Sequence, residues 1–168
     1  MSVPGKLKRI LITGMSGTGK SAVIAELAAR GYRAHDLDTP EWSEWVAASP
    51  SDKLTPVEGR DWVWRQDRVR RLLMDHQDGR LFIAGTSENM STMFPLIDAI
   101  ILLSAPLSML VDRLASRPIG GYGHSSADRR KVADLVSTVE PLLRQVAHLE
   151  IDTQRPVQAT VEEILRRT

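Results

Sequence analysis

The sequence contains no cysteine, and only 5% of its 168 residues are aromatic. Without cysteine the chain can form neither disulfides nor thiolate metal sites, which suits a reducing cytoplasm. Its apolar runs, such as residues 10–12 and 99–103, are far below the roughly 20 residues that span a bilayer. We therefore expect a cytoplasmic protein with no membrane partner.

Neither sign of charge is in excess, because 22 basic residues face 21 acidic ones and the net charge is +1. Such a chain lacks the broad positive field of a duplex-binding protein, so no nucleic-acid partner is expected and any anion site must be local. A length of 168 residues suits one domain with a proper core and is short for two. We expect a single domain over residues 1–168, as a monomer or homodimer.

Apolar periodicity and chain breakers predict a regular alternation of strands and helices. Strands are expected at residues 9–13, 33–37, 81–84, 99–103 and 148–152. Helices are expected at residues 20–30, from 40 onward, and at 59–77, 87–94, 106–116, 127–147 and 157–167. Near-continuous hydrophobicity in the later strands suits a parallel sheet buried on both faces. The prediction is a three-layer, doubly wound α/β domain with a five-stranded parallel sheet.

A phosphate-binding loop stands between the first strand and the first helix. Residues 14–21 read GMSGTGKS and match G-x-x-x-x-G-K-S at every fixed position. The glycines let backbone N–H groups turn toward a phosphate, and the helix N-terminus adds partial positive charge. Lys20 would reach the β- and γ-phosphates, and the Ser21 hydroxyl would coordinate Mg²⁺. ATP-binding residues are thus predicted at Gly14, Met15, Ser16, Gly17, Thr18, Gly19, Lys20, Ser21 and Ala22.

The acid that assists the metal must come from outside the third strand, because that strand ends in Gly85 rather than in a Walker B aspartate. Asp36 and Asp38 follow the second strand, at the edge where ligands bind in open α/β sheets. A carboxylate beside an attacking hydroxyl orients it and takes its proton. Alternatively, Asp38 caps the helix expected near Pro40.

With these motifs the chain resembles the shikimate kinase and gluconate kinase branch of the nucleoside monophosphate kinase-like P-loop family. Besides the P-loop, the resemblance rests on DLD at 36–38, AGT at 84–86, DRLASRPIGGYGH at 112–124 and IDTQRP at 151–156. It implies an ATP-dependent phosphotransferase in which Asp36 lies near Mg²⁺ and Asp38 contacts the acceptor hydroxyl. The expected fold is that of a P-loop NTPase.

The same resemblance assigns the remaining nucleotide contacts. Arg113 and Pro156 would enclose the adenine, with Arg155 in the same base-binding loop, and Arg117 would approach the phosphates. A glycine-rich connection that begins with an arginine indicates a lid at about residues 117–126, and such a lid would close over phosphates. The alternative for either arginine of the lid region is a surface ion pair with Asp112 or Glu140.

The acceptor pocket is expected between the second strand, the helix at 59–77 and the loop after the third strand. Its candidate ligands are Asp38, Arg60, Arg65, Gly85 and Thr86. Four tryptophans within residues 42–64 would suit a planar or partly apolar acceptor, although core or surface positions account for them equally well. A partner-binding surface is a further alternative for this segment.

Shikimate kinases hold the substrate carboxylate with two arginines, and the matching positions here fall near Val63 and Val139. The resemblance therefore does not extend to the acceptor. A nucleoside monophosphate remains open because Arg60 or Arg65 could take its phosphate. An ATP-sensing module or slow ATPase without an acceptor also remains open.

Overall fold

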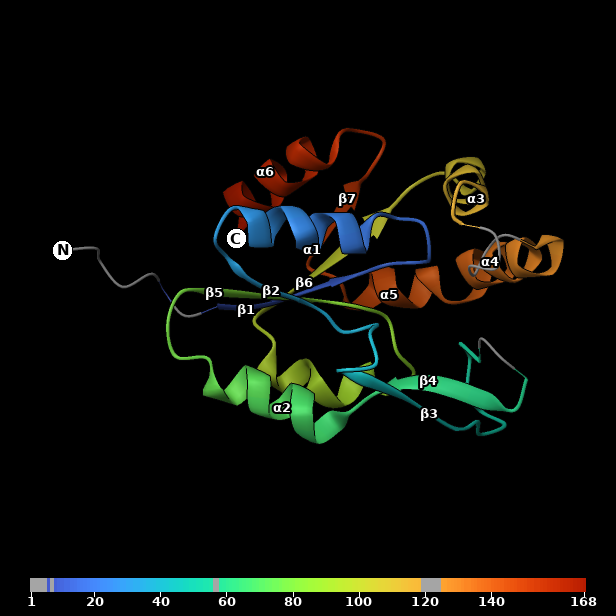
Figure 1. The fold of residues 1–168 in the computed structure, drawn as a ribbon, viewed down its shortest axis with the longest axis horizontal. Coiled ribbons are helices and arrows are strands. Elements are labelled where there is room, and N and C mark those ends of the chain that lie inside the picture. The colour runs from blue at the N-terminus through green and yellow to red at the C-terminus, as the bar shows by residue number, and fades with distance from the viewer. Residues whose placement is uncertain (1–5, 7, 56–57, 119–124) are drawn as a thin grey trace.

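The computed structural model describes residues 6, 8–55, 58–118 and 125–168. Figure 1 shows three layers with a parallel sheet in the middle. The strands lie in the order β2-β5-β1-β6-β7, which are Arg33–Asp36, Arg80–Ala84, Lys8–Thr13, Ala99–Ser104 and Leu149–Asp152. All four pairings are parallel. The predicted fold class is confirmed.

Helices cover both faces of this sheet (Figure 1). One face carries α1 (Lys20–Ala29) and α6 (Val157–Arg167), and the other carries α2 (Gln66–Asp75), the 3₁₀ helix η1 (Met90–Leu96) and α5 (Glu140–Val146). The helices α3 (Leu107–Ala115) and α4 (Ser126–Thr138) lie at the right of Figure 1, near the P-loop that follows β1.

The central strands build two cores because successive side chains point to opposite faces. Leu11 on β1 stands in register with Ile83 on β5 and Ile100 on β6, and all three belong to the core under α2, η1 and α5. Their neighbours Ile10 and Ile12 belong to the core under α1 and α6. Burial on both faces explains why these strands read as continuous apolar runs.

The helix expected at residues 59–77 is wrong in its first part. Arg60–Trp64 is a strand, β4, and pairs antiparallel with β3, Ser43–Ala47, in a separate two-stranded sheet. The sequence RDWVW is rich in aromatic and β-branched side chains, which favour an extended backbone over a helix. Gly59, at φ +76°, turns the chain into β4, and α2 begins only at Gln66.

The helix expected from Pro40 is also wrong, because residues 40–42 form a turn that leads directly into β3. The Ser43 hydroxyl donates to the carbonyl of Leu37 at 2.5 Å and closes this turn. Asp38 therefore caps no helix. The helix expected at 127–147 is interrupted at Val139, two residues before Pro141, and the one expected at 87–94 is the 3₁₀ helix η1.

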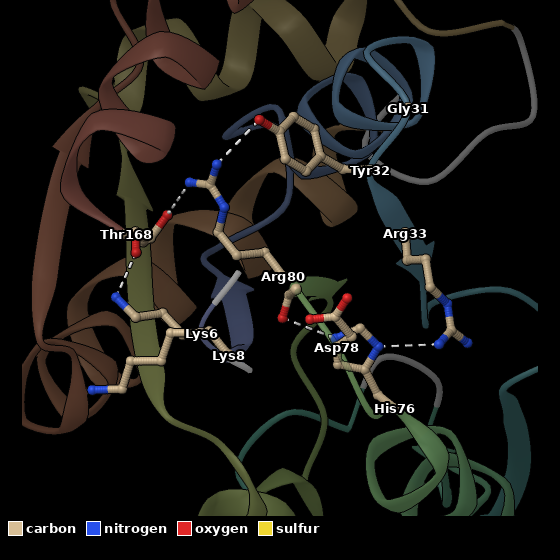
Figure 2. A pocket seen from close by; sticks show the side chains of 10 residues that line it. Lys6, Lys8, Gly31, Tyr32, Arg33, His76, Asp78, Arg80 and Thr168 are labelled. Atoms are coloured by element: carbon tan, nitrogen blue, oxygen red, sulfur yellow. Dashed lines mark hydrogen bonds between the residues drawn. The ribbon is translucent and has the colours of Figure 1, made fainter. Parts of the chain in front are cut away.

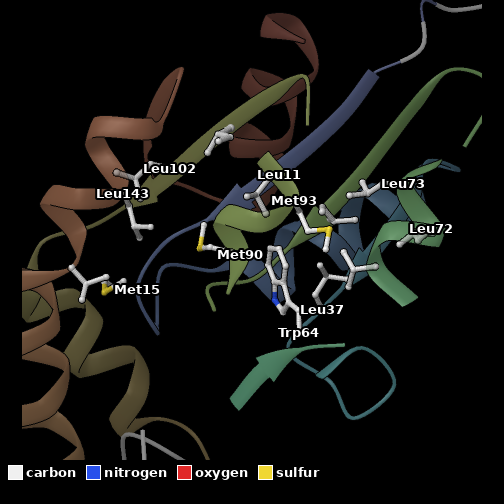
Figure 3. Packing of buried hydrophobic residues seen from close by; sticks show 14 of the residues in the cluster. Leu11, Met15, Leu37, Trp64, Leu72, Leu73, Met90, Met93, Leu102 and Leu143 are labelled. Carbon is white, nitrogen blue, oxygen red and sulfur yellow. The ribbon is translucent and has the colours of Figure 1, made fainter. Parts of the chain in front are cut away.

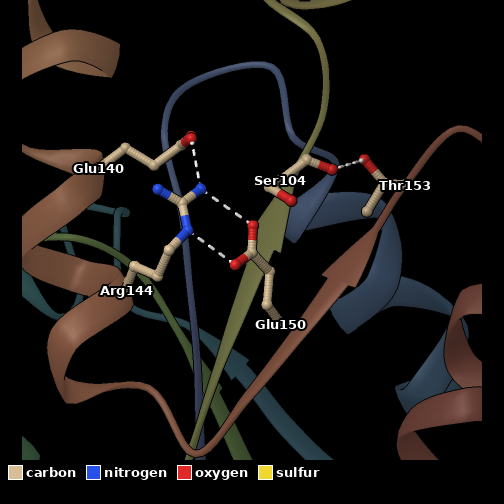
Figure 4. A network of polar contacts seen from close by, with 5 residues as sticks. All are labelled: Ser104, Glu140, Arg144, Glu150 and Thr153. Carbon is tan, nitrogen blue, oxygen red and sulfur yellow. Dashed lines mark hydrogen bonds and ion pairs between the residues drawn. The ribbon is translucent and has the colours of Figure 1, made fainter.

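An ion-pair network fastens α5 to β7, as Figure 4 shows. The Arg144 guanidinium donates to Glu140 at 3.0 Å and to both carboxylate oxygens of Glu150, at 2.8 and 3.0 Å. These bonds hold the pKa of Glu150 below its ordinary value. At the end of β7 the Thr153 backbone N–H donates to the carbonyl of Ser104 at 2.8 Å, which positions the loop that follows.

A cavity of about 560 Å³ lies at the amino ends of β1, β2 and β5 (Figure 2). Three of its basic side chains bond to other protein groups: Arg80 donates to the Tyr32 hydroxyl at 3.1 Å, Arg33 lies 3.0 Å from Nδ1 of His76, and Lys8 donates to the carbonyl of Thr168. Within the described ranges, no helix is both long and apolar enough to cross a membrane.

Candidate active site

A second cavity, of about 740 Å³, opens at the carboxyl ends of the strands, where the P-loop lies. Elements far apart in the sequence line it: the P-loop, the end of β2 and the segment after it, the segment after β5, the hairpin strand β4, and the helices α3 and α4. Its lining residues are Gly14, Met15, Ser16, Gly17, Gly19, Lys20, Ser21, Ala22, Asp36, Asp38, Leu54, Trp62, Thr86, Arg113, Arg117 and Leu135.

Two glycines of the P-loop, Gly14 and Gly17, lie where a side chain would have no room. A Cβ at Gly14 would stand 2.5 Å from the carbonyl oxygen of Leu103, and one at Gly17, where φ is +88°, would stand 3.1 Å from that of Leu110. The buried Thr18 hydroxyl donates to the carbonyl of Met15 at 2.8 Å and stiffens the loop from within. All predicted P-loop residues except Thr18 face the cavity.

Lys20 begins α1, and its ammonium turns back over the loop. Nζ donates to the carbonyl oxygens of Gly14 at 2.7 Å and Met15 at 3.1 Å. Burial lowers the pKa of Lys20, while the carboxylates of Asp38 and Asp36 oppose that shift. The ammonium is thus held in the cavity by carbonyl dipoles and faces both acids.

Ser21 and Asp36, the two predicted metal ligands, are brought together by the fold. The Ser21 hydroxyl donates to Oδ2 of Asp36 at 2.7 Å, and Oδ1 of Asp36 accepts the backbone N–H of Asp38 at 3.0 Å. Hydroxyl and carboxylate oxygens are ligands that Mg²⁺ accepts beside phosphate oxygens and water. In the described ranges no three His, Asp or Glu side chains gather as a metal-binding group.

Asp38 lies across the cavity from Lys20 and above the end of β5. Its carboxylate accepts the backbone N–H of Thr86 and would lie 2.9 Å from a Cβ built on Gly85. The side chain is exposed to the open cavity, while the protein atoms packed around it desolvate the carboxylate. This desolvation raises the pKa of Asp38 to about 6, against the opposing effect of the Lys20 ammonium.

Thr86 fastens β5 to the start of the P-loop. Its hydroxyl donates to the carbonyl of Gly14 at 2.8 Å, accepts the Gly14 N–H at 3.3 Å, and lies 2.8 Å from the Thr13 hydroxyl. The backbone N–H that holds Asp38 belongs to the same residue. Thr86 thus sets the spacing between the phosphate loop and the candidate base.

Arg113 joins the P-loop to the loop after β7. Its guanidinium donates to the carbonyl of Gly17 at 3.0 Å and to the Thr153 hydroxyl and carbonyl at 3.0 and 2.6 Å. A surface ion pair therefore does not account for this side chain. Arg155 and Pro156 are exposed and do not line the cavity, and Pro156 precedes the first turn of α6.

Arg117 lines the cavity at the root of the predicted lid, and its charge contributes to lowering the pKa of Lys20. It therefore lies on the phosphate side. Residues 119–124, which include the glycines of the predicted lid, lie outside the described residues.

Arg60 and Arg65 are not brought to the cavity. The Arg65 guanidinium donates to Glu44 at 2.9 Å, and that of Arg60 lies 5.1 Å from the ring centroid of Trp45. In their place the acceptor side is lined by Trp62, Leu54 and Leu135. The alternation of Trp62 and Trp64 along RDWVW was a signal for a strand with one aromatic face, whereas nothing in the sequence marks Leu54 or Leu135.

A P-loop at the carboxyl edge of this sheet, with a carboxylate beside its serine, places the chain among the P-loop nucleotide-binding proteins. Residues 10–134 match the family model described as an AAA domain, and the chain belongs to that family.

Among curated proteins, the chain is similar to shikimate kinase 2 of Yersinia enterocolitica, with 26% identity over 93% of this chain and 92% of that protein. Its fold is similar to that of a shikimate kinase from Acinetobacter baumannii, solved with shikimate, with a TM-score of 0.63 at 19% identity over 96% of this chain and 93% of the other. It is also similar to that of a gluconokinase from Sinorhizobium meliloti, with a TM-score of 0.57 at 17% identity over 95% of this chain and 90% of the other. The resemblance predicted from the motifs is confirmed.

Proposed function

We propose that this protein is an ATP-dependent kinase that transfers the γ-phosphoryl group of Mg·ATP to a hydroxyl of a small molecule. The observation that carries this proposal is the meeting of Lys20, the Ser21–Asp36 pair and Asp38 in one cavity. The kinase names of the similar proteins support it, and the absence of cysteine suits the reducing cytoplasm where such a reaction would run.

On the phosphate side, the P-loop N–H groups would hold the β- and γ-phosphates, and Lys20 would leave its carbonyl partners to bind them. The oxygens of Ser21 and Asp36 would hold Mg²⁺, directly or through water. When bound, the metal supplies positive charge against the phosphate oxygens. Arg117 would add charge at the transferring group, and Arg113 would border the base. Arg155 and Pro156, which lie outside the cavity, would meet the base only at its rim.

On the acceptor side, Asp38 would accept a hydrogen bond from the attacking hydroxyl. As the hydroxyl oxygen forms its bond to the γ-phosphorus, the bond from that phosphorus to the β–γ bridging oxygen breaks, and the proton passes to the Asp38 carboxylate. ADP leaves with the electron pair of the broken bond. A carboxylate with a pKa of about 6 is ionised near neutral pH and still basic enough to take the proton.

The direct test measures ADP release from Mg·ATP while hydroxyl compounds are added one at a time. A kinase releases ADP in proportion to the acceptor consumed, and the product carries the phosphate by mass spectrometry. A sensor or slow ATPase would release ADP at the same basal rate with every compound, and that result would refute the proposal.

A further inference from the structure

Trp64 carries a polar group that the fold leaves without a partner. The residue is 1% exposed, and Figure 3 shows its ring among Leu37, Met90 and Met93. Its backbone is fully engaged, because the Asn89 side chain accepts the Trp64 N–H at 3.1 Å and donates to the Trp64 carbonyl at 2.9 Å. The indole Nε1 nevertheless has no hydrogen-bond partner. Native proteins rarely leave a buried donor unpaired, and such a group indicates a missing ligand or water.

The unpaired nitrogen lies near the candidate base. A Cβ built on Gly85 would lie 3.1 Å from Nε1 of Trp64 and 2.9 Å from Oδ1 of Asp38. Both polar atoms therefore border the position that a side chain at residue 85 would fill, and the glycine leaves that position open. One is a donor and the other an acceptor, which is the pair of contacts that a hydroxyl group can satisfy at once.

The wall beyond this pair is aromatic and apolar. Trp62 lies on the same face of β4 as Trp64, because side chains two residues apart share a face of a strand. It lines the cavity together with Leu54 and Leu135. The Trp62 ring lies 5.0 Å from that of Trp45 across the hairpin, which holds it in place. Such a wall suits the flat or apolar face of an acceptor.

Among the described residues, no lysine or arginine lines the acceptor side of the cavity. Arg60 lies over Trp45, Arg65 bonds to Glu44, and Lys131 bonds to the carbonyl of Thr55. The cavity's own cations stand on the phosphate side: Lys20 on the loop carbonyls, Arg113 on Gly17 and Thr153, and Arg117 beside Lys20. The residues that the structure leaves undescribed contain no lysine or arginine.

We propose that Trp64 is an acceptor-positioning residue and that the site takes a neutral, ring-bearing hydroxyl compound. This inference rests on the proposed kinase activity. In this arrangement the indole N–H of Trp64 donates to an acceptor hydroxyl, Asp38 accepts from it, and the body of the acceptor lies on Trp62. Acceptors that are recognised through a carboxylate or a phosphate are thereby disfavoured, since a desolvated anion there would have no partner.

The test uses pairs of ring-bearing probes that share their hydroxyls and differ in one anionic group: shikimate methyl ester against shikimate, and quinate methyl ester against quinate. Stimulated ADP release is measured for each at saturating Mg·ATP. We expect the neutral member to be favoured by about tenfold or more in kcat/KM. Preference for the anionic member of any pair would overturn the inference and leave the kinase activity standing.

Trp64→Phe tests the indole N–H itself, because it keeps an aromatic ring and removes the donor. We expect KM for the best neutral probe to rise about tenfold, the scale of one hydrogen bond, while KM for ATP stays constant. Tyr32→Phe is the matched control, because it also removes one polar group from an aromatic side chain, at the opposite end of the sheet, and it should leave both KM values unchanged. An unchanged acceptor KM in a folded Trp64→Phe protein would refute the positioning role.

Binding is followed independently of turnover by the ¹H–¹⁵N signal of the Trp64 indole, assigned through Trp64→Phe, in protein loaded with Mg·ADP. The neutral probes should shift this signal and the anionic ones should not. If no neutral probe moves it, the inference is wrong. If the signal moves but no probe stimulates ADP release, the binding site stands and the proposed kinase activity is what fails.

Discussion

On the phosphate side of the cavity, one short segment supplies nearly every group, and loop carbonyls hold two of its polar side chains: Lys20 is held by those of Gly14 and Met15, and Thr18 by that of Met15. On the acceptor side, single residues arrive from β2, β4, α4 and a loop, and the wall is aromatic. One side is a local structure with a fixed chemical task. The other is an assembly of distant parts, and its specificity can change while the phosphate side stays the same.

Lys20→Ala should have the largest effect, and it should act on the phosphate side. This change removes the ammonium that would stabilise the transferring phosphate, and we expect transfer to fall by roughly 10²- to 10³-fold or more. ATP affinity should weaken as well, whereas the thermal unfolding midpoint should change little because the side chain contributes no core packing. Calorimetry and steady-state kinetics measure the two effects. Unchanged affinity together with unchanged turnover would contradict the phosphate-side assignment.

Asp38→Asn should impair only the function of the acceptor side. The variant keeps the size of the side chain but cannot take the proton, so turnover should fall by about 10²-fold or more while ATP affinity hardly moves. Because the pKa of Asp38 is raised to about 6, the wild-type rate should rise with pH through about 6 and level off above it. The asparagine variant should lack this rise. A wild-type rate in Asp38→Asn would rule out Asp38 as the general base.

Asp36→Asn is the matched variant on the metal side. Neutralising a carboxylate that holds the metal or its water weakens attraction for the cation, so the variant should need more Mg²⁺ to reach its maximal rate. Titrating Mg²⁺ against both aspartate variants separates the two roles. Equal, purely metal-dependent losses in the two variants would show that Asp38 is not the base.

Gly85→Ala tests the junction between β5 and the acceptor wall. The added Cβ would press on Asp38 at 2.9 Å and on Trp64 at 3.1 Å, so both must shift. We expect acceptor kcat/KM to fall by about tenfold or more, with little change in ATP binding. Gly31→Ala is the control, since its φ of +89° imposes backbone strain with nothing within 4 Å of the new Cβ. Similar kinetic losses in both variants would mean that strain, not contact, is responsible.

The smallest expected effect lies away from both sides, in Arg144→Ala. Losing the guanidinium leaves the nearly buried Glu140 unpaired and should lower the free energy of unfolding by about 1–2 kcal/mol near neutral pH. Because Arg144 depresses the pKa of Glu150, the stability it contributes is present above the ordinary value of 4.5 and is lost as pH falls through the depressed value.

Denaturant unfolding at several pH values should therefore show the wild type and Arg144→Ala converging in acid. Arg166→Ala removes an exposed arginine from a surface pair with Glu163 and should change stability little. A constant difference between Arg144→Ala and the wild type down to low pH would rule out the ionic contribution.

The phosphate side could be predicted from the sequence because its determinants are local. The P-loop is a contiguous motif, and residues Ile10 to Ile12 mark the strand before it by their hydrophobicity alone. Asp36 and Asp38 were also predictable, since parallel strands bring their carboxyl ends to one edge wherever the sheet order leads. The five strands of the parallel sheet followed from the same local patterns.

Only the tertiary structure decided the acceptor side. RDWVW becomes a strand because Ser43–Ala47 pairs with it, and the pairing energy comes from residues that are remote in the sequence. In the paired hairpin, Arg60 lies over Trp45, Arg65 bonds to Glu44, and the indole nitrogen of Trp64 lies near Gly85. The sequence by itself determined the position of the proposed phosphate site, because a contiguous loop and a helix end form it. The acceptor side depends on side chains that meet only after the chain has folded.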